Sequence, residues 1–157
     1  MKSIANKIHE GLATAYSDGE IKALTRILAT ELLGVSQMAF YMKDDIALTA
    51  EQEASLDNAI ERLKKHEPIQ YILGYSDFCG LRFKVTPATL IPRPETSELV
   101  EWTANESNGT ESILDIGTGS GCIAVSLASK LPKSSVSAWD ISAGALAVAT
   151  ENSKTSG

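Results

Sequence analysis

The residues best suited to chemistry in this chain form a glycine-rich loop after a short apolar run. The run, Ile113–Ile116, contains one acid, Asp115, and five small residues follow it: Gly117, Thr118, Gly119, Ser120 and Gly121. Glycines at alternate positions permit positive φ and leave space for a ligand to approach the backbone. A strand that passes through such a loop into a helix presents N–H groups and the positive helix end to a bound molecule. The segment therefore predicts a small-molecule site.

The spacing of the glycines separates two classes of site. Dinucleotide-binding loops have the pattern G-x-G-x-x-G, whose third glycine would fall at position 122. This chain has Cys122 there and the pattern G-x-G-x-G instead. A tight turn without a ligand is the structural alternative, but a turn requires one glycine and not three at alternate positions. The loop therefore favours a ligand other than a dinucleotide.

Two carboxylates accompany the loop. Asp140 ends the next predicted strand, 136–140, and lies 25 residues beyond Asp115. This is close to the roughly 20-residue offset at which a ribose-binding acid follows a glycine loop, and two carboxylate oxygens can accept both ribose hydroxyls. The structural alternative for Asp140 is a helix N-cap, although Ser142 is the better candidate for that role. Asp115 either lies close to the ligand or accepts backbone N–H groups and shapes the loop.

A proline-stiffened segment precedes the loop. Pro92 and Pro94 flank Arg93 and restrict it to an extended conformation. An arginine held in this way can bind a carboxylate of a ligand or of a partner. A rigid linker with a solvated arginine explains the same residues. The residue types alone do not decide between a binding role and a structural role for Arg93.

Helical periodicity dominates the first seventy residues, and these helices must position whatever the loop binds or acts on. We expect one helix near the N-terminus, a second that begins at an Asp18 N-cap, and a short third over 37–42. Thr49 and Gln52 have the spacing of a capping box and open a fourth helix. The segment predicts a small helical bundle.

Alternation of apolar and polar residues then predicts a β-hairpin. Leu81, Phe83 and Val85 alternate with basic residues, and Cys79-Gly80 is the expected turn toward a strand around 75–78. The hairpin would link two larger units of the chain.

From residue 112 onward the expected order is strand, glycine loop, helix, strand, helix. Helices between strands imply a parallel sheet with right-handed crossovers. Two parallel strands leave most of a sheet uncovered, so we expect the first part of a larger doubly wound domain and a chain that is a portion of a longer protein. Trp102 and Trp139 are expected to pack in or near the core of that domain.

Charge and cysteine content limit the partners and the compartment. The 157 residues include 14 basic and 20 acidic side chains, which gives a net charge of −6. Residues 1–70 hold 8 basic and 11 acidic side chains and the remainder 6 and 9, so both parts are acidic and direct nucleic-acid binding is not expected.

Cys79 and Cys122 lack metal-ligand spacing, and we expect reduced, buried thiols and no metal. With no signal sequence and no membrane-spanning apolar run, we expect a cytoplasmic protein without membrane contacts.

The order of several motifs resembles one protein family. The G-x-G-x-G loop is similar to the first motif of S-adenosylmethionine (SAM)-dependent methyltransferases. Before it, Glu67–Gly74, Pro87–Thr96 and Leu99-Val100 stand in the order seen in the HemK/PrmC family. That family consists of the N5-glutamine methyltransferases that modify peptide chain release factors.

This resemblance implies an α/β protein in three parts. A helical substrate-recognition domain would occupy residues 1–70, a β-hairpin linker residues 71–92, and the start of a Rossmann-like SAM-dependent methyltransferase domain residues 93–157. The implied reaction moves a methyl group from SAM to the side-chain amide nitrogen of a glutamine in class-1 release factors, during translation termination.

The resemblance also implies roles for individual residues. The five loop residues Gly117–Gly121 would line the SAM site, and Asp140 would accept the ribose hydroxyls. For Asp115 the argument comes from charge: SAM carries an α-amino group and a sulfonium, and a carboxylate close to the loop can hold such a cation directly or through water. Pro92 and Arg93 belong to the linker motif and would face the substrate.

One family motif does not occur in the chain. The family orients the glutamine amide with Asn-Pro-Pro-Tyr, and we expect this motif beyond Gly157, so no catalytic residue is assigned within the chain and the chain alone is expected to be inactive. Two alternatives remain open at this point. One is a SAM-dependent enzyme that methylates DNA or RNA amines, and the other is a non-catalytic helical binding module.

Overall fold

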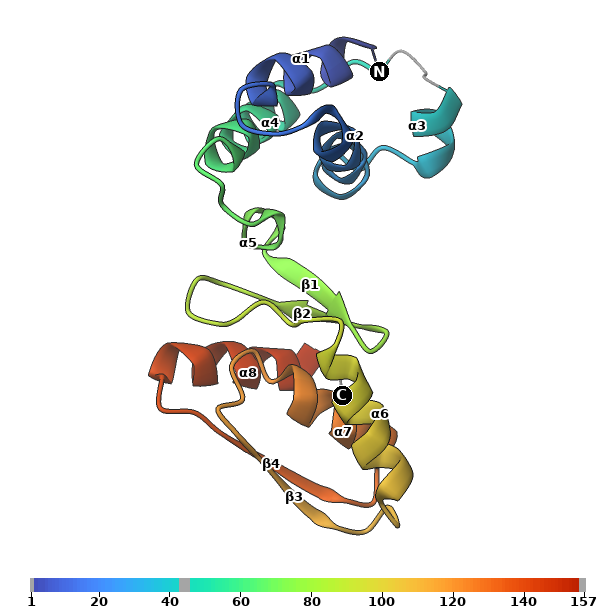
Figure 1. Ribbon diagram of the computed structural model, residues 1–157, viewed down its shortest axis with the longest axis vertical. Coiled ribbons are helices and arrows are strands. Elements are labelled where there is room, and N and C mark those ends of the chain that lie inside the picture. The colour runs from blue at the N-terminus through green and yellow to red at the C-terminus, as the bar shows by residue number, and fades with distance from the viewer. Residues whose placement is uncertain (1, 43–45, 156–157) are drawn as a thin grey trace. The chain divides into compact units, whose positions relative to one another are not determined.

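The computed structural model describes residues 2–42 and 46–155 and divides the chain into two compact units, Met1–Leu73 and Gly74–Gly157. The described part of the first unit consists of helices and connections, and the second unit combines helices with two small sheets (Figure 1). The predicted α/β class is therefore confirmed. No helix within the described ranges combines the length and apolar composition that crossing a bilayer requires.

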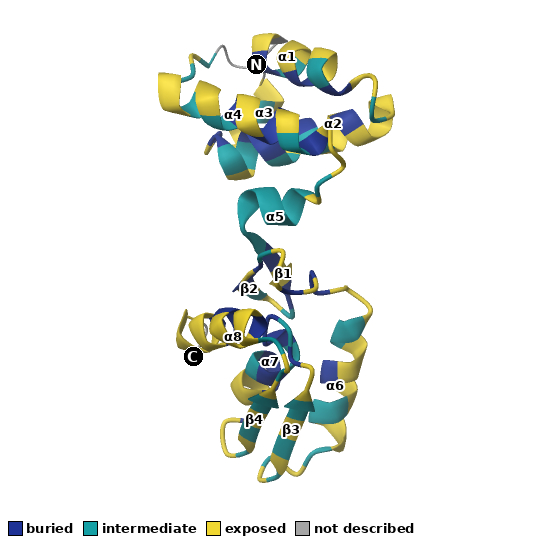
Figure 2. Ribbon diagram, turned by 90° about the vertical axis from the view of Figure 1, so that its left-hand side faces the viewer, coloured by how far each residue is buried: buried dark blue, intermediate teal, exposed yellow. Residues whose placement is uncertain are grey.

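The first unit is built from helices around one apolar core. Its elements are α1 (Lys2–Leu12), α2 (Asp18–Ile27), a π-helical turn (Leu28–Leu32), α3 (Gln37–Met42), α4 (Ala50–Leu63) and α5 (Ile69–Leu73). Figure 2 shows the buried residues on the faces that these helices turn toward one another. The innermost side chains come from α1, the π-helical turn and α4: Ile8, Leu12, Leu28, Leu56 and Leu63. The predicted helical bundle is confirmed.

The helix caps follow from short-range hydrogen bonds, and one prediction is wrong by a residue. Ser17, not Asp18, caps α2, because its Oγ accepts from the Glu20 N–H while the Glu20 carboxylate accepts from the Ser17 N–H. This reciprocal capping box satisfies two backbone donors at once, which an N-cap at Asp18 would not do with this Glu20. The capping box of Thr49 and Gln52 at α4 is confirmed.

The hairpin of the second unit has the predicted strands and turn. β1 (Tyr75–Phe78) pairs antiparallel with β2 (Leu81–Lys84). The two turn residues, Cys79 and Gly80, both have positive φ, +49° and +77°, which is the conformation of a type I′ hairpin turn. Phe78 and Phe83 meet edge to face across the pair at 6.2 Å between ring centroids and are buried. The hairpin thereby contributes to the apolar core of the second unit.

The second sheet consists of two parallel strands, as predicted. Its strands and the surrounding helices are α6 (Thr96–Glu106), β3 (Ser112–Ile116), α7 (Cys122–Lys130), β4 (Ser135–Trp139) and α8 (Ala143–Thr155). Figures 1 and 2 show α7 and α8 on the same side of the strand pair. The side chains of Ile113 and Val136 point to this side and pack against the core.

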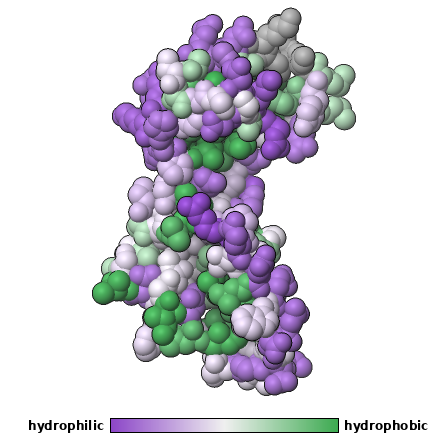
Figure 3. All heavy atoms as spheres, viewed as in Figure 1, coloured by the Kyte–Doolittle hydropathy of each residue, from purple (hydrophilic) through white to green (hydrophobic). Residues whose placement is uncertain are grey.

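The opposite face of this sheet is apolar and exposed. Leu114, Ile116 and Trp139 alternate with the inward residues and are 45%, 75% and 63% exposed, and Figure 3 shows hydrophobic residues at the surface over these strands. Trp102 on α6 is 66% exposed. The prediction that both tryptophans are packed in or near the core is therefore wrong. For Trp139 the reason is that no element of the described ranges covers this face of the sheet.

A polar loop before β3 is fixed by one carboxylate. Glu111 accepts hydrogen bonds from the Ser107 hydroxyl and from the N–H groups of Asn108 and Thr110. The bond from Ser107 is the main cause that lowers the pKa of Glu111 from 4.5 to about 2. A carboxylate with a depressed pKa stabilises the folded state above its unfolded pKa and loses this effect as the pH falls toward the folded pKa.

We therefore expect the loop 107–111 to lose order as the pH falls from about 4.5 to about 2. The chemical shifts of the Asn108 and Thr110 amides, followed by NMR, would report this transition. In Glu111→Gln the same amides should show no titration in this range. A wild-type loop whose amide shifts stay constant down to about pH 2 would contradict the prediction.

Candidate functional site

The two acidic residues predicted for the site lie at the same edge of the sheet. Asp115 is next to last in β3, and Asp140 directly follows β4. Ile116 is paired with Trp139 in the parallel register, so both strands end together and the glycine loop leaves from this edge. Parallel sheets bind ligands at the carboxyl ends of their strands. The structure thus brings together the loop and both carboxylates.

The backbone of the loop is tied to the end of β4. The N–H groups of Gly117 and Thr118 both donate to the carbonyl of Trp139, at 2.8 and 3.0 Å. The Gly121 N–H donates to the Thr118 carbonyl at 2.8 Å. These bonds hold the loop in one shape without a ligand, which reduces the ordering that binding would require.

Asp140 organises the loop from the other side. Its Oδ2 accepts from the Gly119 N–H at 2.8 Å, and its Oδ1 accepts from the Ser142 N–H at 2.9 Å. The bond from Ser142, followed by that from Gly119, lowers the pKa of Asp140 below its ordinary value. Each ionised carboxylate oxygen has about two lone-pair sites, so each can still accept a hydroxyl of a ligand.

The structure identifies the residue that caps α8. Ser142 is the cap of α8, because its Oγ accepts from the Ala145 N–H at 3.2 Å. The expectation that Ser142 is the better cap candidate is confirmed. Asp140 directly follows β4 and accepts from the loop at Gly119 and from the cap residue Ser142, and its role toward a ribose stays a prediction.

Asp115 contacts the loop through the side chain of Thr118. Its Oδ2 accepts from the Thr118 hydroxyl at 2.7 Å, and Thr118 is buried. One alternative from the sequence was that Asp115 shapes the loop by accepting backbone N–H groups. The structure agrees that Asp115 bonds to the loop, but the donor is a hydroxyl and not a backbone N–H. Asp115 itself is half-buried.

The three glycines of the loop have two different roles. A Cβ on Gly117 or Gly119 would meet no atom within 4 Å, so these positions border open space. A Cβ on Gly121 would lie 3.1 Å from the Ala149 Cβ and 3.2 Å from its Cα. Gly121 therefore allows α7 to begin directly against α8, whereas the first two glycines leave room for a ligand.

The start of α7 adds a partial positive charge to the site. Gly121 is the N-cap residue, and no side chain caps this end of the helix. Free N–H groups at a helix N-terminus attract negatively charged groups. Cys122, which follows, is a free and buried cysteine, and burial raises the pKa of its thiol. The half-buried Cys79 is free as well, and burial raises its pKa too.

The linker reaches the site at Ala88. A Cβ on Gly144, in the first turn of α8, would lie 3.2 Å from the Ala88 Cβ and 3.6 Å from the Ser142 Oγ. The linker thus runs close to the residue that donates to Asp140. Further along, Pro92 is buried and Arg93 is exposed. Within the described chain Arg93 makes no hydrogen bond or ion pair with Asp115 or Asp140.

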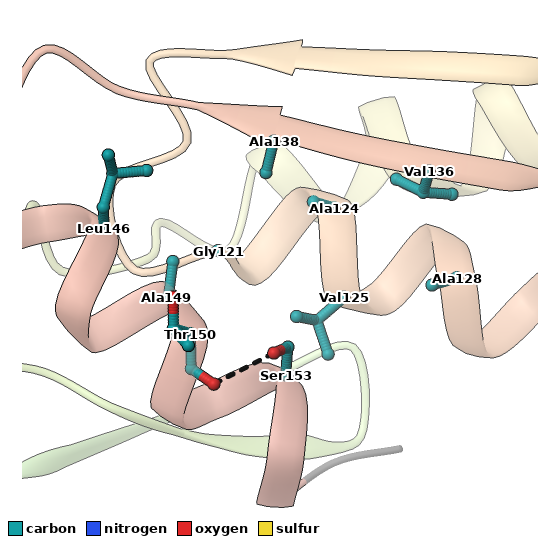
Figure 4. Close-up of a pocket in the computed structure, with 10 residues that line it drawn as sticks. All are labelled: Gly121, Ala124, Val125, Ala128, Val136, Ala138, Leu146, Ala149, Thr150 and Ser153. Carbon is teal, nitrogen blue, oxygen red and sulfur yellow. Dashed lines mark hydrogen bonds between the residues drawn. The ribbon is translucent and has the colours of Figure 1, made fainter.

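One hollow of this unit lies apart from the polar site, between α7, β4 and α8. Its volume is about 250 Å³, and Figure 4 shows that small apolar side chains form most of its lining. Leu146 and Ala149 border it from α8, but neither Asp115 nor Asp140 lines it. We attribute it to imperfect packing of the two helices, since it offers no charged group to orient a ligand.

Sequence reasoning missed one residue that contacts the loop. Asn152 on α8 is 1% exposed and donates to the Ser120 carbonyl at 2.8 Å. A signal was present: Ala145, Val148 and Ala149 recur at helical spacing, and Asn152 is the next position of the same buried face. A polar residue at such a position must find hydrogen-bond partners inside the protein.

Two family models match separate parts of the chain. The model described as the PrmC N-terminal domain matches residues 6–74, and the model described as the methyltransferase small domain matches residues 96–157. The first covers the helical unit, and the second covers α6, the glycine loop and both carboxylates.

Curated relatives resemble the chain over nearly its whole length. A relative from Bacteroides thetaiotaomicron is 49% identical over 98% of this chain, which corresponds to 55% of the relative. Relatives from Flavobacterium psychrophilum and Coxiella burnetii are 41% and 36% identical over 97% and 98% of the chain, and 55% and 56% of their own lengths are covered. All three are named release factor glutamine methyltransferase. The chain spans about half the length of the curated relatives it matches.

Proposed function

Because this chain belongs to the HemK/PrmC family of methyltransferases, we propose that it provides the cofactor-binding and substrate-recognition parts of a release factor glutamine methyltransferase. The reaction would transfer a methyl group from SAM to the side-chain amide nitrogen of a glutamine in a class-1 release factor. The observation that carries this proposal is the pairing of the glycine loop with Asp140, in a chain 49% identical to a relative of that name.

SAM fits the charges and the space of the site. The ribose hydroxyls would donate to Asp140, whose two oxygens are held in place by the Gly119 and Ser142 N–H groups. The methionine part of SAM would lie over Gly117 and Gly119, where no side chain intervenes. The exposed part of Asp115 would attract the α-ammonium group and the sulfonium.

The chemistry of the acceptor explains why binding alone is not enough. A glutamine amide nitrogen is a weak nucleophile, because its lone pair is delocalised into the carbonyl group. SAM supplies the electrophilic methyl group, and the amide must be held so that its lone pair is in line with the bond that breaks. The family motif for this task, Asn-Pro-Pro-Tyr, does not occur in residues 1–157, so we assign the residues of this chain roles in binding and orientation.

We assign recognition of the release factor to the helical part, residues 1–70, and to the linker, residues 71–92, with the start of the methyltransferase domain at 93–157. Both parts of the chain are acidic, which suits a protein partner better than a nucleic acid. Buried Pro92 holds exposed Arg93 at the end of the linker, where the guanidinium would contact a carboxylate of the substrate. The site of action would be the cytoplasm, where release factors are found.

Mass spectrometry of a release factor tests the proposal. A full-length methyltransferase that carries residues 1–157 should add one methyl group to a single glutamine of the release factor in the presence of SAM. Fragmentation of the modified peptide would place the methyl group on the side-chain amide. Transfer to DNA or RNA alone would support the nucleic-acid alternative, and SAM-independent binding of the release factor without transfer would support a non-catalytic module.

A further inference from the structure

One buried amide connects two elements that the proposed function treats separately. Asn152 lies on the buried face of α8, and the side chains that share this face are apolar. Its partners are in β2, at the end of the hairpin, and in the glycine loop. An isolated amide in such surroundings is costly unless every polar atom is paired.

The first two bonds complete the free edge of β2. Tyr75 and Lys84 are opposite each other, and the next residue, Val85, donates its N–H to the Gly74 carbonyl. Hydrogen-bonded and non-bonded pairs alternate in antiparallel strands, so the N–H and C=O of Lys84 point away from β1. Asn152 Oδ1 accepts from that N–H at 2.8 Å, and Asn152 Nδ2 donates to that carbonyl at 3.0 Å.

The third bond reaches the glycine loop. Asn152 Nδ2 also donates to the Ser120 carbonyl at 2.8 Å, and Ser120 is 2% exposed. A primary amide has two N–H donors and one carbonyl oxygen, and all of these groups are used here. Aspartate has the same shape but no donor, so it would place a carboxylate against two carbonyl oxygens.

We propose that Asn152 is a positioning residue of the cofactor site, which fixes the Ser120 carbonyl relative to β2. Ser120 lies between Gly119, whose N–H bonds to Asp140, and Gly121, which begins α7. A shift of the Ser120 carbonyl would therefore move both neighbours. The inference rests on the proposed use of the loop for SAM, and it adds that one side chain bonds both the hairpin and the loop directly.

The isosteric variant Asn152→Asp tests this role in a full-length methyltransferase that carries the chain. We expect the KM for SAM to rise roughly tenfold, the effect of losing donors to buried carbonyls, while kcat at saturating SAM stays unchanged. Glu151→Gln is the matched control. It breaks the exposed Lys84–Glu151 ion pair, 2.7 Å between Nζ and Oε2, which joins β2 to α8 beside Asn152, and the KM should not change.

A second measurement does not depend on SAM or on activity. In the ligand-free protein, amide hydrogen exchange at Gly119 and Gly121 should be faster in Asn152→Asp and in Asn152→Ala than in the wild type and in Glu151→Gln. If both variants exchange like the wild type at these glycines, or if their KM for SAM is unchanged, the positioning role is wrong. A wild-type protein that shows slow exchange but binds no SAM would instead overturn the proposed function.

Discussion

Replacing Asp140 by alanine in a full-length methyltransferase that carries this chain should weaken SAM binding about 30-fold. The carboxylate would accept the ribose hydroxyls, and hydrogen bonds to a charged acceptor contribute about 2 kcal/mol. The variant also removes the acceptors of the Gly119 and Ser142 N–H groups, which loosens the loop. Isothermal titration calorimetry with SAM measures the change directly.

Two comparisons make the Asp140 result specific. Asp140→Asn keeps the size of the side chain and one oxygen acceptor, so its loss of affinity should be intermediate. Asp77→Ala removes an equal charge from the exposed hairpin ion pair with Arg82, and SAM affinity should stay at the wild-type value. The hydrogen bonds from Ser142 and Gly119 hold the pKa of Asp140 below its ordinary value, so Asp140 itself should cause no change in SAM affinity between about pH 5 and 8. Unchanged affinity in Asp140→Ala would refute the ribose role.

The second large effect is expected for Gly121→Ala, which should destabilise the second unit by about 2–5 kcal/mol. Gly121 has φ of +80°, and an L-residue there is strained by about 1–2 kcal/mol. Its Cβ would also lie 3.1 Å from the Ala149 Cβ, and such overpacking adds about 1–3 kcal/mol. The two tryptophans of the chain, Trp102 and Trp139, are both in the second unit, so their fluorescence during urea unfolding reports this unit.

Gly117→Ala is the control that separates strain from collision. Gly117 has nearly the same φ, +79°, but a Cβ there meets no atom within 4 Å. Its cost in the free energy of unfolding should be limited to the strain, about 1–2 kcal/mol. Equal losses in the two variants would show that the contact between Gly121 and Ala149 does not limit the packing of α7 on α8.

Local signals were sufficient to predict most elements of the fold. The turn at Cys79-Gly80, the capping box at Thr49 and the helix at 37–42 depend on neighbouring residues, and all three are confirmed. The cap of α2 was placed one residue late, because Ser17 and Asp18 are both good caps and only the reciprocal bond with Glu20 decides between them.

Very short elements, a local change in helical hydrogen bonding and the exposure of a sheet face were not predictable in this way. The short helix α5 has five residues and too little periodicity to recognise. The π-helical turn 28–32 continues the apolar spacing of α2, so the pattern alone does not reveal the change in hydrogen bonding. Trp139 was expected in or near the core because it is large and apolar, but its strand has a helical layer on one side only within the described chain.

At the site, spacing predicted which residues meet but not how they bind one another. The parallel register was enough to bring Asp115, the loop and Asp140 to one edge. The N–H groups of all three loop glycines turn out to donate to protein oxygens, which glycine spacing does not specify. Asn152 was missed because its partners, Lys84 and Ser120, are 68 and 32 positions away along the chain.

The division of the chain at residue 73 also sets an order of events during synthesis. All members of the helical core lie before this point, and contacts between nearby helices form quickly. A ribosome releases the N-terminal part first, and domains fold as units as they emerge. β3 must wait for β4, and the Ser120 carbonyl receives its amide partner only when Asn152 has been made. The part that we propose to recognise the release factor can thus be folded before the cofactor loop has its final shape.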